Sequence, residues 1–309
     1  MIDGMTRKGW STALLFLLFV SACGSPPEAG VSATPTGGAG STITVNLGER
    51  PFKLHLPTSY DAATKMPLVV LLHGYTSTAA EAESYLKLTA ESDRRGFLYA
   101  MPDGTKDARG DQFWNATEAC CDFYGSGVDD SGYLRRLLDT VASSHPVDPG
   151  QVYVIGHSNG GFMAYRLACD HPSAVTAVVS FAGAATNDPA QCTPARPVNV
   201  LQIHGTADST IRWEGGANAG RSYPSVAATL DLWRRLNGCS DRAGPAAAPM
   251  DLDSSLPGPE TTVTTYLTNC RDQTRVELWS MKGAEHVPAL TTGFAPALTG
   301  FLLDQVAHR

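Results

Sequence analysis

The sequence predicts a single α/β domain with a mostly parallel sheet and helices on both of its faces. The first indication is an alternation of short apolar runs with amphipathic runs from residue 42 onward, which is the pattern of repeated strand–helix units. The second is that no internal linker or repeat divides this part of the chain. Residues 42–309 are therefore expected to form one domain rather than two.

Two kinds of strand are expected in this domain. Thr42–Leu47 and Phe52–Leu56 alternate polar and apolar residues, as strands of an antiparallel edge do. Pro67–Leu72 is continuously apolar, which is typical of a parallel strand buried on both faces. Runs of the second kind also occupy Gly96–Met101, Val152–Ile155, Val175–Phe181, Val198–Ile203 and Val276–Met281.

Helices are expected between these strands. Tyr133, Leu134, Leu137, Leu138 and Val141 have the spacing of one helix face, and Asp129 or Asp130 stands near its start, where a carboxylate is favoured. Similar patterns occupy Phe162–Leu167, Val226–Leu236 and Ala297–Val306. The strand–helix order predicts right-handed crossovers in a sheet that is covered on both sides.

Composition excludes several classes of protein. The 309 residues are 43% hydrophobic and 17% charged, which is too apolar for a disordered chain and too mixed for a membrane bundle. The net charge of −7 is the opposite of what a free-standing nucleic-acid binder needs, so no nucleic-acid partner is expected.

The N-terminus has the form of a targeting segment. Arg7 and Lys8 precede the apolar run Ser11–Val20, which is too short to span a bilayer. The run ends in small residues before Cys23 and resembles a bacterial lipoprotein cleavage box. We expect residues 1–22 to be a signal peptide, lipid on Cys23 to be the only membrane contact, and residues 23–41 to be a flexible tether. An ordinary secretory signal cut nearby is the alternative, and either one predicts an extracytoplasmic protein.

The cysteine count fits export. Besides Cys23 there are six cysteines, which can form three disulfides in fifteen pairings. Cys239 and Cys270 flank a Pro/Gly-rich stretch and are the pair we expect. The adjacent Cys120 and Cys121 are expected to pair outward rather than with each other. No metal site is expected, because C-x-x-C and H-x-x-x-H spacings are absent.

The sharpest motif is Gly156-His157-Ser158-Asn159-Gly160, of the form G-x-S-x-G. Such a pentapeptide arises by chance, but here a buried-strand pattern precedes it and a helical pattern follows it. A sharp strand-to-helix turn exposes the serine Oγ at the carboxyl end of a sheet, and its glycines avoid collisions with neighbouring backbone. Ser158 is therefore the candidate nucleophile; the alternative is a plain turn with a capping serine.

A serine nucleophile needs a base, and the base needs an acid that orients it. Of the eight histidines, His286 alone lies in a loop between the last predicted strand and the last helix. Asp208 follows the buried strand Val198–Ile203 and so belongs at the same edge. The chain order Ser158, Asp208, His286 is that of α/β hydrolases. Asp170 and Asp188 follow poorer strands, and capping is the alternative role for Asp208.

An oxyanion hole completes the expected site. One donor should be the main-chain N–H of Asn159, directly after the serine, and the other that of Tyr75, after the first buried strand. His73 and Gly74 are expected to shape that turn.

Four ordered motifs carry a resemblance to a known family: PLVVLLHGYTST, FWNATEACCD with GVDDSGYL, VYVIGHSNGGFMAYRLAC and LQIHGTADSTIRWEGG. Together they are similar to polyhydroxybutyrate depolymerases and feruloyl esterases, the α/β hydrolases grouped around carbohydrate esterase family 1. The resemblance covers nearly all of residues 42–300. It implies an α/β-hydrolase fold and hydrolysis of carboxylic esters. A large lid domain is not expected, because only about a dozen residues separate Gly183 from Val198. It also suggests that Trp114 and the Cys120-Cys121 pair lie near the rim of the site.

The chain departs from this family at two places. Relatives often carry a Trp-Pro pair after the histidine, where Val287-Pro288 stands here, and a Pro-Tyr pair after the aspartate, where Arg212-Trp213 stands here. The substrate of these relatives therefore cannot be assigned to this chain from the resemblance. Trp114 and Trp213 are the candidate substrate-binding residues, with Phe123 and Tyr124 as further members of an aromatic platform; core packing is the alternative for each.

These observations predict a serine esterase that works through an acyl-enzyme without any cofactor, on an ester substrate, with polymeric esters among the candidates. The alternatives are a serine peptidase similar to prolyl oligopeptidase, and a non-catalytic surface lipoprotein that binds glycan or polymer.

Overall fold

The computed structural model describes residues 37–305. The expected signal peptide, Cys23 and most of the expected tether lie outside the described residues. The first strand, β1, begins at Ser41, and the N–H of Gly40 already donates to the carbonyl of Leu56. No helix within residues 37–305 is both long and apolar enough to cross a bilayer.

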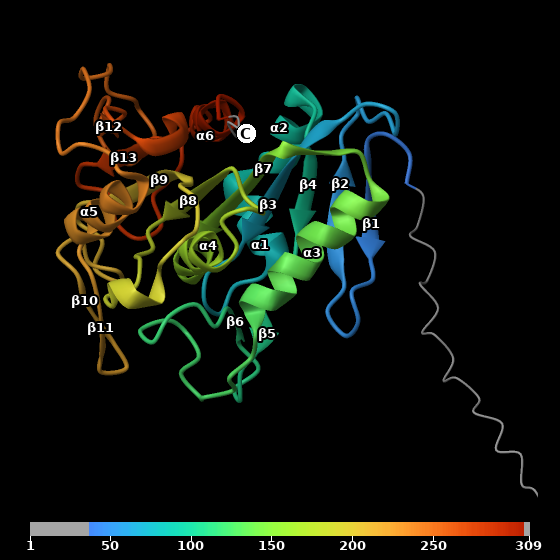
Figure 1. Ribbon diagram of the computed structural model, residues 1–309, viewed down its shortest axis with the longest axis horizontal. Helices are drawn as coiled ribbons and strands as arrows, with labels where there is room; N and C mark the ends of the chain where they lie inside the picture. Colours follow the sequence, from blue (N-terminus) through green and yellow to red (C-terminus); the bar gives the residue numbers. More distant parts are fainter. Residues whose placement is uncertain (1–36, 306–309) are drawn as a thin grey trace, which may run out of the picture. The chain divides into compact units, whose positions relative to one another are not determined.

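A nine-stranded sheet forms the centre of this domain, in the order β1-β2-β4-β3-β7-β8-β9-β13-β12 (Figure 1). The six strands from β4 to β13 in this order run parallel, while β1 and β2 at one edge and β12 at the other pair antiparallel with their neighbours. The bounds are β1 Ser41–Val45, β2 Phe52–Leu56, β3 Met66–Leu72, β4 Leu98–Met101, β7 Val147–His157, β8 Ala177–Phe181, β9 Asn199–Gly205, β12 Thr261–Tyr266 and β13 Val276–Met281.

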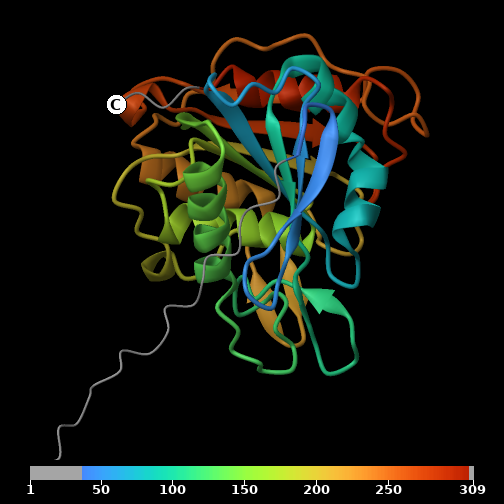
Figure 2. The ribbon, with the colours of Figure 1, turned by 90° about the vertical axis from the view of Figure 1, so that its right-hand side faces the viewer.

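Helices cover both faces of the sheet, as expected for an α/β hydrolase. Figure 2 shows the sheet between the two helical layers. The helices α3 (Asp130–Ser144), α4 (Asn159–Asp170) and α5 (Val226–Asn237) pack on one face with strand residues such as Val70, Val154 and Val200. The helices α1 (Ala79–Leu86), α2 (Leu88–Arg95) and α6 (Phe294–Leu303) pack on the other, against alternate strand residues such as Leu71 and Ile155. The central strands are apolar throughout because both faces are buried.

Two small hairpins stand beyond the carboxyl ends of the parallel strands. They are β5 (Thr105–Lys106) with β6 (Gln112–Phe113), and β10 (Gly216–Asn218) with β11 (Arg221–Tyr223). The connection from β8 to β9 holds only the short helix η1 (Pro189–Gln191). No lid domain is inserted at this point, where the sequence predicts none.

Three disulfides join the six cysteines of the described domain. Cys239 pairs with Cys270, as expected, and Cys169 pairs with Cys192. The expectation that Cys120 and Cys121 pair outward is wrong, because they pair with each other. Both are buried, and the four other cysteines of residues 37–305 form pairs of their own.

Candidate active site

Ser158 stands at the sharp turn between β7 and α4, in a backbone conformation that few residues adopt. Its φ of 54° and ψ of −119° lie outside the regions open to an L-residue without strain. Its N–H donates to the carbonyl of Phe181 at 2.7 Å, which fixes the turn to the end of β8. A β carbon at Gly156 would lie 1.9 Å from the carbonyl oxygen of Gly160, so only glycine permits this approach of strand and helix.

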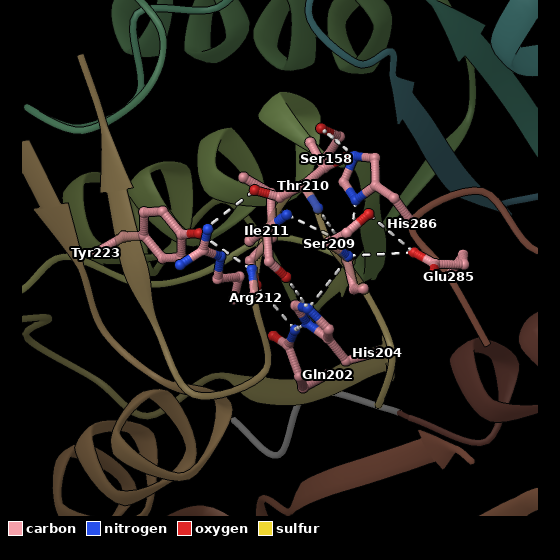
Figure 3. Close-up of polar contacts among 12 residues, drawn as sticks. Ser158, Gln202, His204, Ser209, Thr210, Ile211, Arg212, Tyr223, Glu285 and His286 are labelled. Carbon is pink, nitrogen blue, oxygen red and sulfur yellow. Dashed lines mark hydrogen bonds and ion pairs between the residues drawn. The ribbon is translucent and has the colours of Figure 1, made fainter. Parts of the chain in front are cut away.

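The structure brings His286 to this serine from 128 residues away. His286 lies in the loop between β13 and α6, and its Nε2 is 2.9 Å from Oγ of Ser158. Its Nδ1 is 2.8 Å from Oδ2 of Asp208, which follows β9. Figure 3 shows His286 next to Ser158 and to the turn that holds Ser209 and Thr210. All three side chains come from the carboxyl edge of the sheet, as the sequence predicts.

Asp208 is held as a buried carboxylate. Its side chain has no exposed surface. Oδ1 accepts the main-chain N–H groups of Thr210 and Ile211, at 2.9 and 2.8 Å. Burial by itself raises the pKa of Asp208, but hydrogen bonds from His204 and His286 outweigh it and hold that pKa well below its usual range. The carboxylate therefore stays ionised and can keep the Nδ1–H tautomer of His286 in place.

The two expected oxyanion donors lie beside the serine. The N–H of Asn159 stands at the N-terminus of α4, and Tyr75 follows Gly74, where an added β carbon would lie 3.4 Å from Cβ of Ser158. Within the described residues neither of these two N–H groups donates to another protein atom. An acceptor next to Ser158 would therefore find two free donors.

Trp114 does not bind substrate at the rim; that expectation is wrong. The side chain is fully buried, and its Nε1–H donates to the carbonyl of His73 at 3.1 Å. The main-chain N–H of Trp114 donates to Oδ1 of Asn159, and its carbonyl accepts from Nδ2 of the same side chain. Trp114 thus braces the two segments that carry the expected oxyanion donors. The aromatic pattern of the sequence could not separate this role from a surface one.

His73 is part of the same support, in the place that the sequence predicts. The N–H of Gly104 donates to its Nε2 at 2.8 Å, so the ring proton is on Nδ1, where the carbonyl of Gly74 accepts it at 2.7 Å. Burial lowers the pKa of His73, which keeps the ring neutral. With both nitrogens occupied, His73 shapes the turn and is not a second base.

Trp213 is half-buried, and its ring packs edge-on against His204 at 5.9 Å between centroids. It is not among the residues that line the cavity next to Ser158. Phe123 and Tyr124 are exposed, as a platform requires, and Phe123 packs edge-on against Tyr75. The aromatic rim therefore consists of Tyr75, Phe123 and Tyr124 rather than of the two tryptophans.

A cavity of about 340 Å³ opens beside Ser158 and His286. Its wall is mainly apolar and includes Tyr85, Leu86 and Val287. Tyr85 is fixed in place because its hydroxyl donates to the carbonyl of Pro288 at 2.9 Å and its ring stacks on Phe181. Tyr85 is not among the expected site residues, because the short helix that carries it has only a weak pattern in the sequence. His157 also lines the cavity, and burial together with the charge of His286 lowers its pKa to about 4.

A serine, a histidine and an aspartate hydrogen-bonded in series at the carboxyl edge of such a sheet define a serine hydrolase of the α/β-hydrolase fold. Comparison with known proteins shows which family of hydrolases the chain belongs to. It belongs to the family described as "Putative esterase", whose model matches residues 46–287. The chain is a carboxylic ester hydrolase, and the peptidase and the non-catalytic binder are not favoured.

Three relatives illustrate the range of the family. The chain is 30% identical to "Putative esterase NocK" of Nocardia uniformis subsp. tsuyamanensis, over 81% of this chain and 74% of the relative. It is 27% identical to feruloyl esterase B of Piromyces equi, over 60% of this chain but only 35% of that protein. It is also 27% identical to a poly(3-hydroxybutyrate) depolymerase of Ralstonia pickettii, over 79% of this chain and 50% of that protein. The resemblance that the motifs indicate is therefore confirmed.

Solved structures agree on the fold. The acetyl xylan esterase from Aspergillus awamori superposes with a TM-score of 0.61 at 16% identity, covering 85% of this chain and 99% of that one. A thermostable esterase superposes with a TM-score of 0.56 at 12% identity, covering 86% and 63%.

Proposed function

We propose that Ser158, His286 and Asp208 are the catalytic triad of this ester hydrolase. The observation that carries the proposal is the unbroken series of contacts from Oγ of Ser158 through the His286 ring to Oδ2 of Asp208, at 2.9 and 2.8 Å. These distances are within reach of proton transfer without any rearrangement of the site.

The reaction follows from these contacts. Oγ of Ser158 attacks the ester carbonyl carbon while Nε2 of His286 takes the hydroxyl proton. The tetrahedral intermediate collapses, the C–O bond of the ester breaks, and His286 returns the proton to the leaving alcohol. A water molecule then attacks the acyl-enzyme by the same proton route and releases the acid. The ionised Asp208 stabilises the imidazolium that forms twice in each cycle.

The N–H groups of Tyr75 and Asn159 are proposed to hold the oxygen that becomes negative in both tetrahedral intermediates. Both are main-chain donors that are fixed before substrate arrives, and one stands at a helix N-terminus, so they cost little reorganisation. Removal of one such donor typically costs about 100- to 1,000-fold in kcat.

The acyl group is proposed to enter the apolar cavity beside Ser158, and the half-buried Tyr75 with the exposed Phe123 and Tyr124 to contact the remainder of the substrate. An open aromatic rim can contact a substrate that is longer than the cavity, so we propose that the substrate is a polymeric ester. Polyhydroxyalkanoate, feruloylated or acetylated polysaccharide and synthetic polyester are the candidates. Rates on hydroxybutyrate oligomers, methyl ferulate and acetylated xylan would rank them.

The protein is further proposed to act outside the cytosol, held to a membrane by lipid on Cys23. The sequence around Cys23 and the three disulfides of the described domain support export. Metabolic labelling with a clickable fatty acid, in the wild type and in Cys23→Ala, tests the anchor; equal labelling would exclude lipid at this residue.

The triad is tested with Ser158→Ala. We expect it to retain the fold, to lose nearly all turnover of a short-chain p-nitrophenyl ester, and to resist labelling by a fluorophosphonate. Ser209→Ala, a serine in the neighbouring turn, is the control and should still be labelled. Wild-type turnover by a folded Ser158→Ala would refute the assignment.

A further inference from the structure

Asp208 faces a second imidazole besides that of His286. Nε2 of His204 lies 3.3 Å from Oδ2 of Asp208, the same oxygen that His286 contacts. His204 is the next-to-last residue of β9, and its side chain is almost completely buried. Figure 3 shows His204 on the far side of Ser209 and Ile211 from Ser158. A buried histidine needs partners for both ring nitrogens, and the identity of these partners fixes which nitrogen carries the proton.

A chain of buried groups behind His204 determines that proton. The hydroxyl of Tyr165 donates to Oε1 of Gln202 at 2.5 Å, so the amide nitrogen of Gln202 points the other way. That nitrogen donates to the carbonyl of Gly183 and to Nδ1 of His204, both at 2.9 Å. Nδ1 of His204 is therefore an acceptor, and Nε2 carries the hydrogen. Tyr165 and Gln202 are themselves fully buried, so solvent does not compete for these bonds.

The N–H of His204 is directed at the turn that carries Asp208. Nε2 lies 2.7 Å from the carbonyl oxygen of Ile211, in addition to its contact with Asp208. The N–H of Ile211 in turn donates to Oδ1 of Asp208. The N–H of His204 therefore holds the end of the turn at Ile211 and also lies against the carboxylate of Asp208, where the turn begins.

We propose that His204, held in one tautomer by Gln202 and Tyr165, is a positioning residue that orients Asp208 toward His286. The proposal rests on the triad proposed above. His204 does not contact the reacting atoms and does not line the cavity at Ser158. It acts on catalysis by holding the carboxylate that holds the base. Groups so arranged in a dry interior are worth more than their pairwise contacts suggest.

The proposal differs from simple packing in what it predicts for pH. Without the N–H of His204, the negative charge of Asp208 is less shared and acts more strongly on His286, so His286 is protonated more readily. The acid limb of kcat/KM should then move to higher pH. Other titratable groups nearby are His157 beside His286, and Glu285, which accepts from Ser209. Neither changes in the variants below.

The test compares His204→Phe, which keeps a flat ring but no donor, with His204→Gln, whose amide can donate at a similar place. We expect kcat of His204→Phe on a p-nitrophenyl ester to fall roughly 10- to 100-fold, with little change in KM. We also expect the acid limb of kcat/KM in His204→Phe to shift to higher pH. His204→Gln should recover most of the lost kcat and most of the original acid limb. Tyr165→Phe removes only the hydroxyl at the start of the chain and should give a smaller shift of the same sign.

The outcomes separate this proposal from the triad. Wild-type kcat and acid limb in His204→Phe, beside an inactive Ser158→Ala, would overturn the positioning role and leave the triad intact. A lower kcat with an unmoved acid limb and no recovery in His204→Gln would reduce His204 to a packing residue and overturn the proposal as well. If His204→Phe does not fold, the acid limb of Tyr165→Phe decides: a shift to higher pH supports the positioning role, and an unmoved limb overturns it.

Discussion

Trp114 and Asn159 hold each other through two hydrogen bonds that join the main chain of one to the side chain of the other. The N–H of Trp114 donates to Oδ1 of Asn159 at 2.7 Å, and Nδ2 of Asn159 donates to the carbonyl of Trp114 at 2.9 Å. Both residues are fully buried. Because Asn159 directly follows Ser158, this clamp ties the loop of Trp114 to the helix end that carries one proposed oxyanion donor.

Asn159→Ala should therefore lower both stability and activity. Its main-chain N–H remains, but the N–H of Trp114 loses its partner inside the core and the carbonyl of Trp114 keeps only the N–H of Cys121, which costs about 1–3 kcal/mol in the free energy of unfolding. A displaced donor should lower kcat roughly 10-fold or more. Urea unfolding and ester turnover measure the two effects.

Asn237 offers a matched control for this variant. Its side-chain amide makes an equivalent clamp with the N–H and carbonyl of Val198, at 3.2 and 2.7 Å, and it is equally buried. Asn237→Ala should lose a similar amount of stability and keep its kcat. Equal kcat values in the two variants would show that the Trp114 clamp has no catalytic role.

His157 predicts a dependence of stability on pH. Its pKa is lowered to about 4 by burial and by the charge of His286, whereas an unfolded histidine titrates near 6.5. Between these values the unfolded chain binds the proton more tightly, so the stability that His157 contributes is complete above about pH 6.5 and lost as the pH falls toward 4.

The measurement is urea unfolding at pH 7 and pH 4.5 for the wild type and His157→Gln. Glutamine can keep a donor toward the carbonyl of His286, which Nε2 of His157 contacts at 3.1 Å, but it does not titrate. We expect the loss on acidification to be smaller in the variant by about 1–2 kcal/mol. Equal losses of unfolding free energy on acidification in the two proteins would mean that His157 is not shielded from solvent as the structure indicates.

Most of the sheet and the positions of the three proposed triad residues could be predicted from the sequence, because buried parallel strands and a strand–serine–helix turn have strong local signals. Pro67–Leu72 and Val276–Met281 were expected within one residue of β3 and β13. Ser158, Asp208 and His286 each follow such a strand, so topology alone gathers them at one edge.

The helices and the strand that were not predicted have only weak patterns of apolar residues. The helix α2 has the sequence LTAESDRR, in which few residues are apolar, and α1 buries only two alanines and a leucine. The strand β12, TTVTTY, lies at an antiparallel edge and is only partly buried. The role of Trp114 and the pairing of Cys120 with Cys121 depend on contacts with Asn159 and with the rest of the core, which no spacing along the chain encodes.

The Cys239–Cys270 disulfide should stabilise the fold without affecting the site. It closes a loop of 31 residues that contains β12, and Cys270 lies near the start of β13, opposite the edge that carries Ser158. In the chain-entropy account, a loop of this length is worth roughly 3–4 kcal/mol. The double variant Cys239→Ser/Cys270→Ser should unfold at lower denaturant concentration and keep the kcat of the wild type. A fall in kcat below the unfolding transition would contradict this separation.

Val287 should set the length of acyl group that the cavity accepts. It lines the cavity directly after His286, yet 59% of its surface is exposed, so a larger side chain can be accommodated without disturbing the core. Val287→Trp should lower kcat/KM for p-nitrophenyl octanoate by roughly 10-fold or more, because lost cavity space costs about 1–3 kcal/mol, and change the value for the acetate little. Leu267→Trp, at an exposed position beside the opposite edge of the sheet, is the control. A parallel loss with both esters would place the acyl group elsewhere.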